Sequence, residues 1–285
     1  MDTVLVTGGA GYIGSHAVLA LRAAGRAVVV LDDLSTGARG LVPADVPLIL
    51  GDVADADRVG SLLRDHRVGT IMHFAGSIIV PESVADPLKY YRNNTAASRS
   101  LIEACVTAGV GRFIFSSTAA VYGNPPAQMV TEQTPAAPVS PYGWSKLMTE
   151  QMLADVAAAH PAFRSIALRY FNVAGADPQG RAGQVTPNAT HLVKLACETA
   201  LGRRDALNIF GTDYPTPDGT CVRDYIHVSD LADAHVCALG HLEGGGDSLV
   251  LNCGYGRGYS VRQVAAAMER AAGRPLPQLE APRRP

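Results

Sequence analysis

Short apolar runs without polar alternation recur through the first 171 residues. They occupy Thr3–Thr7, Ala27–Leu31, Pro47–Leu50, Thr70–Phe74, Arg112–Phe115 and Ser165–Phe171. Such runs are typical of parallel strands that are buried on both faces. Helical periodicity appears between them at 15–24, at 82–108 with an interruption near Asp86-Pro87, and after Ser140. This alternation predicts an α/β fold with a doubly wound parallel sheet of the Rossmann type.

The pattern changes after Asn172, where a segment rich in Gly, Asp and Pro spans 174–189. Beyond it we expect a helix at 191–201, strands at 207–210 and 249–252, and a helix from about 229. Ser260 and Gln263 form a capping box for a helix at 261–272. We therefore expect two domains, 1–172 and a smaller C-terminal α/β domain at 173–285.

Composition narrows the class of partner. The chain has 285 residues, 47% of them hydrophobic, and a formal net charge of -2 with no basic stripe, which argues against nucleic acid or an anionic membrane surface. It has no secretion leader pattern and no apolar run near the ~18 residues that span a bilayer, so we expect a cytoplasmic protein with a small-molecule partner. Five dispersed cysteines and eight histidines without ligand spacing argue against disulfides and a metal site.

A glycine turn follows the first strand directly. Gly8, Gly11 and Gly14 are three residues apart and lead into the first helix. Without side chains, they allow backbone amides and a helix N-terminus to approach a pyrophosphate. A tight turn alone would also explain them, but Asp32 ends the next strand, 18 residues past Gly14, where a carboxylate accepts bonds from a ribose. This favours NAD, while Arg39 in the following loop keeps NADP open.

Other strand ends offer further candidate cofactor contacts. Asp52 follows the third strand and either meets an adenine amino group or caps a helix from Ala54. Ala75-Gly76 after the fourth strand would permit close passage of a cofactor, and Asn93 lies within reach on the next helical stretch. His73 is interpreted as a packed core residue.

A hydroxyl, a phenol and an ammonium are candidates for the chemistry. Thr118 ends the fifth strand, where ligands bind in open α/β sheets. Ser140 is a suitable N-cap, so Tyr142 and Lys146 fall four residues apart on one helix face. An ammonium near a phenol lowers a pKa that is about 10 in water and favours proton exchange with a sugar hydroxyl. A solvated Tyr and Lys on a helix surface is the alternative.

With these residues in order, the chain resembles the UDP-glucose 4-epimerase family of extended short-chain dehydrogenases/reductases. The resemblance runs from Val4 to Arg284 and rests on long segments rather than single residues. They are VTGGAGYIGSH at 6–16, HFAG at 73–76, FSSTAAVYG at 115–123, SPYGWSKLMTE at 140–150, RYFNVAGA at 169–176 and GRRDALNIFGTDYPTPDGTCVRDYIHVSDLADAH at 202–235.

The resemblance implies a function for each part of the chain. Residues 1–172 would bind NAD and 173–285 mainly the UDP-sugar, with about 225–255 packing back on the first domain. Catalysis would use Thr118, Tyr142 and Lys146. NAD contacts would come from Gly8, Gly11, Tyr12, Ile13, Gly14, Asp32, Asp52, Val53, Phe74, Ala75, Gly76, Asn93, Tyr142, Lys146 and Phe171. UDP-sugar contacts would come from Thr118, Asn172, His191, Asn208, Phe210, Arg223 and Arg284.

The implied reaction inverts C4 of a UDP-hexose through a 4-keto intermediate. Tyr142 removes the proton of the 4-hydroxyl, hydride moves between C4 and tightly bound NAD, and Thr118 bonds the same oxygen. The resemblance also implies a homodimer through helices near 83–108 and 141–158, although these apolar faces would equally suit an internal core.

The chain departs from the family pattern in three places. Ile78 stands where the family has a lysine, His191 stands where it has an asparagine, and the chain ends at Pro285, before a family Gly-Asp pair that closes over the nucleotide. The early end keeps a non-catalytic NAD-binding protein as one alternative. Another sugar-nucleotide epimerase or a 4,6-dehydratase is a second, but Ala119-Ala120 beside Thr118 supply no acid to expel water.

Overall fold

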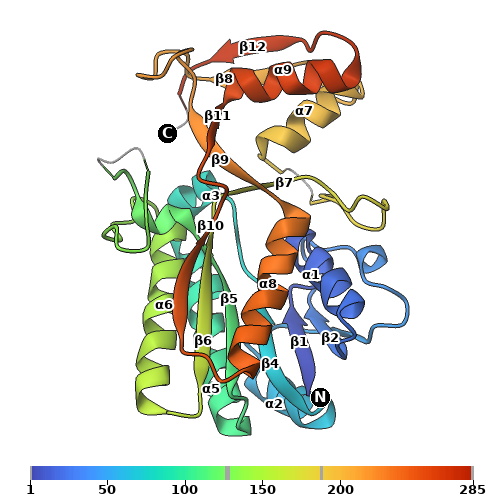
Figure 1. The fold of residues 1–285 in the computed structure, drawn as a ribbon, viewed down its shortest axis with the longest axis vertical. Helices are drawn as coiled ribbons and strands as arrows, with labels where there is room; N and C mark the ends of the chain where they lie inside the picture. The colour runs from blue at the N-terminus through green and yellow to red at the C-terminus, as the bar shows by residue number, and fades with distance from the viewer. Residues whose placement is uncertain (1, 126–128, 187–188, 284–285) are drawn as a thin grey trace.

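The computed structural model of the chain describes residues 2–125, 129–186 and 189–283. A larger lobe surrounds a parallel sheet, and a smaller lobe stands beyond the carboxyl ends of its strands (Figure 1). In the described residues no helix is long and apolar enough to cross a membrane.

The large sheet has seven parallel strands in the order β10-β6-β5-β4-β1-β2-β3. Their bounds are β1 Thr3–Thr7, β2 Val28–Asp32, β3 Leu48–Leu50, β4 Val68–His73, β5 Arg112–Thr118, β6 Arg164–Tyr170 and β10 Leu249–Cys253. The chain runs outward from β1 in both directions, first to β3 and then from β4 to β10. This reversal places a crevice at the carboxyl ends of β1 and β4. The predicted doubly wound parallel sheet is confirmed.

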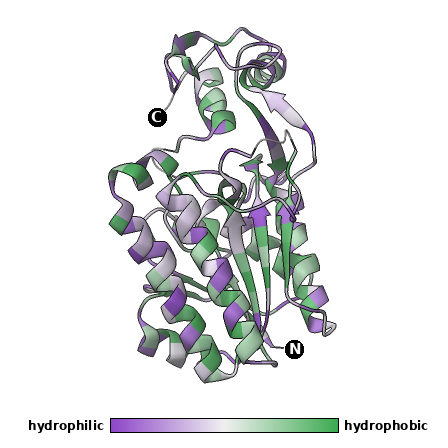
Figure 2. Ribbon diagram, turned by 90° about the vertical axis from the view of Figure 1, so that its left-hand side faces the viewer, coloured by the Kyte–Doolittle hydropathy of each residue, from purple (hydrophilic) through white to green (hydrophobic). Residues whose placement is uncertain are grey.

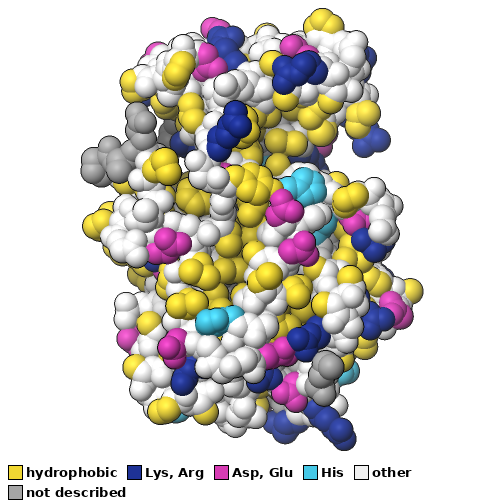
Figure 3. All heavy atoms as spheres, in the orientation of Figure 1, with side chains coloured by type: hydrophobic (Ala, Val, Ile, Leu, Met, Phe, Trp, Pro, Cys, Tyr) yellow, Lys and Arg dark blue, Asp and Glu magenta, His cyan; other side chains and the backbone are white. Residues whose placement is uncertain are grey.

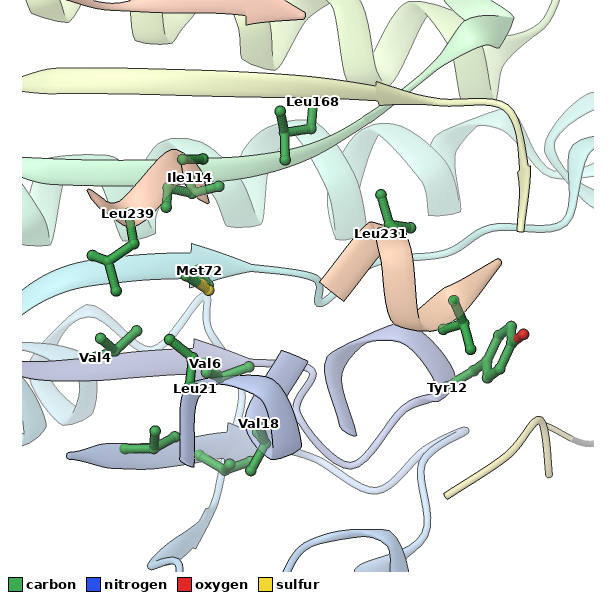
Figure 4. Packing of buried hydrophobic residues seen from close by; sticks show 14 of the residues in the cluster. Val4, Val6, Tyr12, Val18, Leu21, Met72, Ile114, Leu168, Leu231 and Leu239 are labelled. Carbon is green, nitrogen blue, oxygen red and sulfur yellow. The ribbon is translucent and has the colours of Figure 1, made fainter. Parts of the chain in front are cut away.

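Helices cover both faces of this sheet. Helices α1 (Tyr12–Ala23) and α8 (Val228–Glu243) lie on one face, and α2 (Ala56–Asp65), α5 (Ala97–Ala108) and α6 (Pro141–Ala159) lie on the other. Side chains alternate accordingly: Val4 and Val6 pack with α1 and α8, whereas Leu5 between them packs with α2 and α5. Figure 4 shows the first of these clusters, with Val18 and Leu21 of α1 beside the strands and Leu231 and Leu239 on α8.

Polarity changes along the strands of the large sheet. Figure 2 shows strands that are hydrophobic over most of their length and hydrophilic at several arrowheads. The sequences agree, since β2 ends in Asp32, β4 in His73 and β5 in Ser-Ser-Thr. The chain thus places polar groups at the edge of the sheet where the crevice lies.

The helical stretch before β5 is broken where the sequence indicates. Helix α3 (Val80–Ala85) ends at Asp86, whose side chain accepts from the Lys89 N–H and caps α4 (Pro87–Tyr90). A π-helical turn, η2 (Tyr91–Ala96), then leads into α5. Such a turn is often found at functional sites because it redirects side chains.

The smaller lobe pairs two helices with short strands. Helices α7 (Leu192–Ala200) and α9 (Val261–Ala272) pack on β8 (Leu207–Phe210), which pairs in parallel with β12 (Gln278–Ala281). The predicted capping box at Ser260 and Gln263 is present. A ribbon of β7 (Asn172–Ala174), β9 (Val222–His227) and β11 (Gly258–Ser260) connects the lobes. Short 3-10 turns occur at η1 (Arg39–Leu41) and η3 (Ala119–Tyr122).

Candidate active site

The glycine turn between β1 and α1 has no room for side chains. A Cβ at Gly8 would lie 2.6 Å from the backbone nitrogen of Ala75, and one at Gly14 would lie 2.2 Å from the Gly8 carbonyl oxygen. Gly8 also has a positive φ of 70°, and Gly11 is the N-cap of α1. The turn therefore brings β1, β4 and the start of α1 together and leaves the first N–H groups of α1 directed at the crevice. This arrangement fits the pyrophosphate of a dinucleotide.

The two residues after Gly11 contribute differently. The Tyr12 hydroxyl donates to the Gly175 carbonyl at 2.6 Å, so this side chain ties α1 to the segment after β7. Burial raises the pKa of Tyr12 well above its usual range. Ile13 packs partly against the α1 and α8 core. The Tyr12 hydroxyl is therefore already bonded within the chain.

Asp32 is held in place at the end of β2. Its Oδ2 accepts from the Ala10 N–H and its Oδ1 from the Leu34 N–H, both at 2.8 Å. Burial raises the pKa of Asp32, and the two backbone bonds oppose this by favouring the carboxylate. Each oxygen keeps a further lone pair for a ribose hydroxyl.

Asp52 is not the N-cap of a helix, which was one of the two roles expected of it. Helix α2 begins later, with Asp55 as the N-cap that accepts from the Arg58 N–H. Asp52 is exposed after β3 and accepts from Ala54 N–H in a local turn, while Val53 beside it is buried in the core. The alternative in which Asp52 caps a helix from Ala54 is therefore excluded, because α2 begins at Ala56 with its own cap at Asp55.

Small residues after β4 face the glycine turn. Phe74 is half-buried, and 4.8 Å separates the centroid of its ring from that of the His235 ring. Ala75 adjoins Gly8, and Gly76 has a positive φ of 153°. His73 is fully buried and bonds to Thr7 and Ser98 through its two ring nitrogens. Burial lowers the pKa of His73 to about 3, so it is a neutral core residue, as interpreted from the sequence.

Two consecutive asparagines clamp the loop after Gly76. Asn93 donates to the Ser77 hydroxyl at 3.1 Å and is half-buried. Asn94 is buried, accepts from the Ser77 N–H at 2.7 Å and donates to the Ser145 hydroxyl at 3.0 Å. Sequence reasoning identified Asn93 but missed Asn94, which connects this loop to α6.

Helix α6 begins where the sequence predicts. The Ser140 side chain accepts from the Gly143 N–H at 3.2 Å, and Pro141 is the first helical residue. A Cβ at Gly143 would lie 2.7 Å from the Ala120 carbonyl oxygen, so glycine lets the turn after Thr118 contact the first turn of the helix. A glycine within a helix is unfavourable by itself, and here it marks a close approach.

Tyr142 and Thr118 meet at this contact. A hydrogen bond joins the two side chains, and the Thr118 oxygen also accepts from the Ala120 N–H at 3.1 Å. Burial raises the pKa of Tyr142, and the bond with Thr118 lowers it, with burial the larger effect. The ring of Tyr90 packs edge-on against that of Tyr142, with 6.3 Å between centroids.

Lys146 bonds elsewhere than the sequence suggests. Its ammonium is buried, donates to the Ser116 carbonyl at 2.9 Å and lies 4.9 Å from the centre of the Phe115 ring. Burial lowers the pKa of Lys146 to about 8. The expectation that Lys146 lowers the pKa of Tyr142 is therefore wrong for the protein by itself, because the ammonium is bound to β5 and burial of the phenol dominates.

The expected sugar-nucleotide contacts are spread over several elements. Phe171 follows β6, Asn172 on β7 donates to the Asp224 carbonyl at 3.0 Å, and Arg223 lies exposed on β9. His191 is the N-cap of α7 and accepts from the Gln184 side chain at 2.7 Å, while burial lowers its pKa. Figure 3 shows the surface hollowed between the two lobes.

Two of the expected contacts lie on β8 in the smaller lobe. Asn208 and Phe210 alternate with the buried Leu207 and Ile209. Asn208 lines a pocket of about 480 Å³ together with residues of α7, the following turn and β12. The other expected contacts do not line this pocket within the described residues. Arg284 lies outside the described residues.

The parallel sheet, its glycine turn and the group formed by Thr118, Tyr142 and Lys146 define a Rossmann-type dinucleotide-binding enzyme. Residues 4–254 match the NAD dependent epimerase/dehydratase family. The chain is 62% identical over 282 residues to UDP-glucose 4-epimerase of Azospirillum brasilense, covering 99% of this chain and 81% of that protein.

Solved structures agree over the whole chain. UDP-glucose 4-epimerase from Brucella ovis in complex with NAD has a TM-score of 0.96 and 45% identity, covering 100% of this chain and 87% of that one. The enzyme from Bifidobacterium longum in complex with NAD+ and UDP has a TM-score of 0.95 and 39% identity, with the same coverage. The chain belongs to the NAD dependent epimerase/dehydratase family, and NAD is its cofactor.

Proposed function

We propose that this chain inverts C4 of a UDP-hexose, interconverting UDP-glucose and UDP-galactose with tightly bound NAD. The observation that carries the proposal is the hydrogen-bonded pair of Thr118 and Tyr142 beside Lys146, at the carboxyl edge of the sheet that holds the glycine turn. The relatives named above, one of which is in complex with NAD+ and UDP, support the same substrate class.

The cofactor would lie across the carboxyl ends of the strands. Gly8, Gly11 and Gly14 would admit its pyrophosphate to the start of α1, and Asp32 would accept from the adenosine ribose. When bound, NAD supplies a hydride acceptor that becomes a hydride donor to the same carbon. Tyr12, Ile13, Asp52, Val53, Phe74, Ala75, Gly76, Asn93 and Phe171 complete the proposed contacts.

Tyr142 is the proposed general base for the sugar 4-hydroxyl. Transfer of that proton to the Tyr142 phenolate, together with loss of the C4 hydrogen as hydride to the cofactor, would leave a 4-keto sugar. The phenol would return the proton when the hydride returns and the alcohol forms again with the opposite configuration. Thr118 bonds to Tyr142 and would bond the same sugar oxygen. Lys146 would supply positive charge beside the site while its ammonium remains anchored to Ser116.

The smaller lobe and its connecting ribbon would hold the UDP group. Arg223 is proposed to bind the diphosphate, because a guanidinium matches phosphate oxygens with two donors. Asn172, His191, Asn208, Phe210 and Arg284 are the other proposed contacts. In this division residues 1–172 bind NAD and 173–285 mainly the UDP-sugar. Helix α8 and strand β10 pack with the large sheet, which supports assigning 225–255 to the NAD-binding part.

We also propose a homodimer through α5 and α6. Trp144 and Met148 lie four residues apart on α6 and remain 43% and 41% exposed, which is unusual for large apolar side chains on one helix face. Light scattering of the purified protein should give twice the chain mass. A monomeric mass at micromolar concentration would exclude this interface. The cytoplasmic location of the protein stays a prediction from the sequence.

Incubation of the purified 285-residue protein with UDP-galactose tests the function. UDP-glucose should appear without added reductant, and UDP-galactose should appear when UDP-glucose is supplied. No conversion by protein that retains NAD would contradict the proposal and favour a non-catalytic NAD-binding protein. A 4-keto-6-deoxy product would instead indicate a dehydratase, which the alanines after Thr118 disfavour.

A further inference from the structure

A buried ion pair joins α6 to the large sheet one helical turn beyond Lys146. Glu150 on α6 and Arg169 on β6 are only 8% and 7% exposed. Arg169 Nη2 donates to Glu150 Oε2 at 2.6 Å, and Nε donates to Oε1 at 3.0 Å. Burial alone would lower the pKa of Arg169, and the bonds to Glu150 and Tyr122 raise it above its ordinary value. The two charges therefore persist as a forked pair in the interior.

Strand β5 contacts the same carboxylate. The Ser117 hydroxyl donates to Glu150 Oε1. Its two neighbours make the other contacts between β5 and this helix face, since the Ser116 carbonyl accepts from Lys146 and the Thr118 side chain bonds to Tyr142. Residues 142, 146 and 150 are spaced by four and share one face of α6. Three consecutive residues of β5 thus contact three residues of α6 that lie on successive helical turns.

Arg169 also reaches the turn that follows Thr118. Its Nη1 donates to the Tyr122 hydroxyl at 2.9 Å, and the guanidinium lies 4.9 Å from the centre of the Tyr122 ring. Tyr122 in turn donates to Asn252 on β10 at 2.7 Å. One guanidinium therefore contacts both the helix that carries Tyr142 and the turn that begins at Thr118.

An internal ion pair is poorly explained by stability alone. Desolvation of two charges offsets most of their attraction, so an apolar pair of similar volume would hold the elements together about as well. An apolar pair, however, does not fix the orientation of the helix. The two-bond pair of Glu150 and Arg169, with the additional bond from a hydroxyl, forms at only one rotation and one axial position of α6. The geometry points to a role in alignment.

We propose that Glu150 and Arg169 are positioning residues that fix the rotation and height of α6 against β5 and thereby align Tyr142 with Thr118. The proposal rests on the proposed function in that aligned hydroxyls matter for C4 chemistry. Neither residue touches the substrate in this account.

Three variants separate alignment from stability. Glu150→Gln keeps the shape but leaves Arg169 without its charge partner. Ser117→Ala removes only the strand contact, and Glu150→Gln with Arg169→Met removes both charges. Asp45→Asn is the matched control, since it breaks the exposed Arg22–Asp45 pair in the same lobe, away from α5 and α6. For each holoenzyme we would measure kcat, KM for UDP-galactose, retained NAD and Tm.

Alignment predicts a split between kcat and the other quantities. Glu150→Gln should lower kcat on the order of 10- to 100-fold with KM and bound NAD close to wild type, because small misplacements of reacting groups have effects of this size. Ser117→Ala should shift kcat in the same direction by less. The double variant should regain Tm but not kcat, and Asp45→Asn should change neither. Wild-type kcat in Glu150→Gln, or recovery of kcat together with Tm in the double variant, would overturn the proposal.

A second readout does not depend on turnover. Ultraviolet titration of Glu150→Gln, taken as the difference from the same protein carrying Tyr142→Phe, reports the pKa of Tyr142. Loss of the bond with Thr118 should raise this pKa relative to the wild-type background, because that bond lowers it. An unchanged titration would overturn the alignment role. If the wild-type chain itself fails to convert UDP-galactose, the proposed function fails while this titration still decides the positioning claim.

Discussion

The proposed catalytic residues and the proposed diphosphate ligand Arg223 differ in how firmly the chain itself holds them. Tyr142 and Lys146 are fixed by partners on β5, and both lie on a capped helix. Arg223, by contrast, is exposed and, within the described residues, donates only to the carbonyl of its neighbour Val222. The proposed catalytic groups are thus pre-aligned by the fold, whereas the guanidinium proposed to bind the diphosphate keeps donors to share with a ligand. The predictions below test this contrast.

Replacing the proposed base should have the largest effect on turnover. Tyr142→Phe removes the hydroxyl and leaves the ring packed against Tyr90, so kcat should fall about 100- to 10,000-fold while NAD remains bound. Steady-state kinetics with UDP-galactose and the NAD content of the denatured protein provide the measurement. Unchanged turnover would remove Tyr142 from this role.

Filling the glycine turn should abolish cofactor retention. In Gly14→Ala the new Cβ would meet the Gly8 carbonyl oxygen at 2.2 Å, so the turn must open. The purified variant should carry little NAD and show a lower Tm. Gly40→Ala is the matched control in the same lobe, because nothing lies within 4 Å of its Cβ position and its φ is not positive. Equal NAD content in the two variants would contradict the proposed role of the glycine turn in binding NAD.

Loss of the exposed guanidinium should weaken binding and spare chemistry. Arg223→Met should raise KM for UDP-galactose about 10- to 100-fold, which corresponds to one charge-assisted hydrogen bond, with kcat little changed. UDP should compete less well to the same degree, as measured by inhibition. A fall in kcat at unchanged KM would show that this residue belongs to the pre-aligned set instead.

The smallest expected effect is a change in how stability depends on pH. The folded-state pKa of Lys146 is about 8, below the ordinary 10.5 of an unfolded chain. Between these values the unfolded state binds more protons, so the free energy of unfolding should rise with pH as the penalty for the buried charge disappears. Lys146→Met should remove at least about 1 kcal/mol of this rise. Denaturant unfolding at pH 7 and pH 10 measures how much the free energy of unfolding of each protein rises with pH. An equal rise in the two proteins would contradict the prediction.

The fold was predictable from the sequence because its signals are local. Buried strands appear as uninterrupted apolar runs, and Ser140, Asp86 and the Ser260 box cap helices within a few residues of themselves. The glycine turn was equally predictable, because Gly8, Gly11 and Gly14 lie between a strand and a helix and Asp32 ends the next strand.

The electrostatics of the site were not predictable, because they depend on contacts between distant segments. The spacing of Tyr142 and Lys146 correctly put both on one helix face, but the acceptor of the ammonium, Ser116, lies 30 residues away in sequence. Glu150 pairs with Arg169 on β6, 19 residues away in sequence, and no local pattern indicates this contact. The cap at Asp55 rather than Asp52 shows that even local signals compete.

The most direct test of the account follows the hydrogen at C4 of the sugar. The purified protein is incubated with UDP-galactose that carries deuterium at C4, in ordinary water and without added reductant. The account predicts UDP-glucose with the deuterium retained at C4, because the hydride leaves and returns within one closed site. UDP-glucose with deuterium lost to water, or no product from protein that retains NAD, would contradict it.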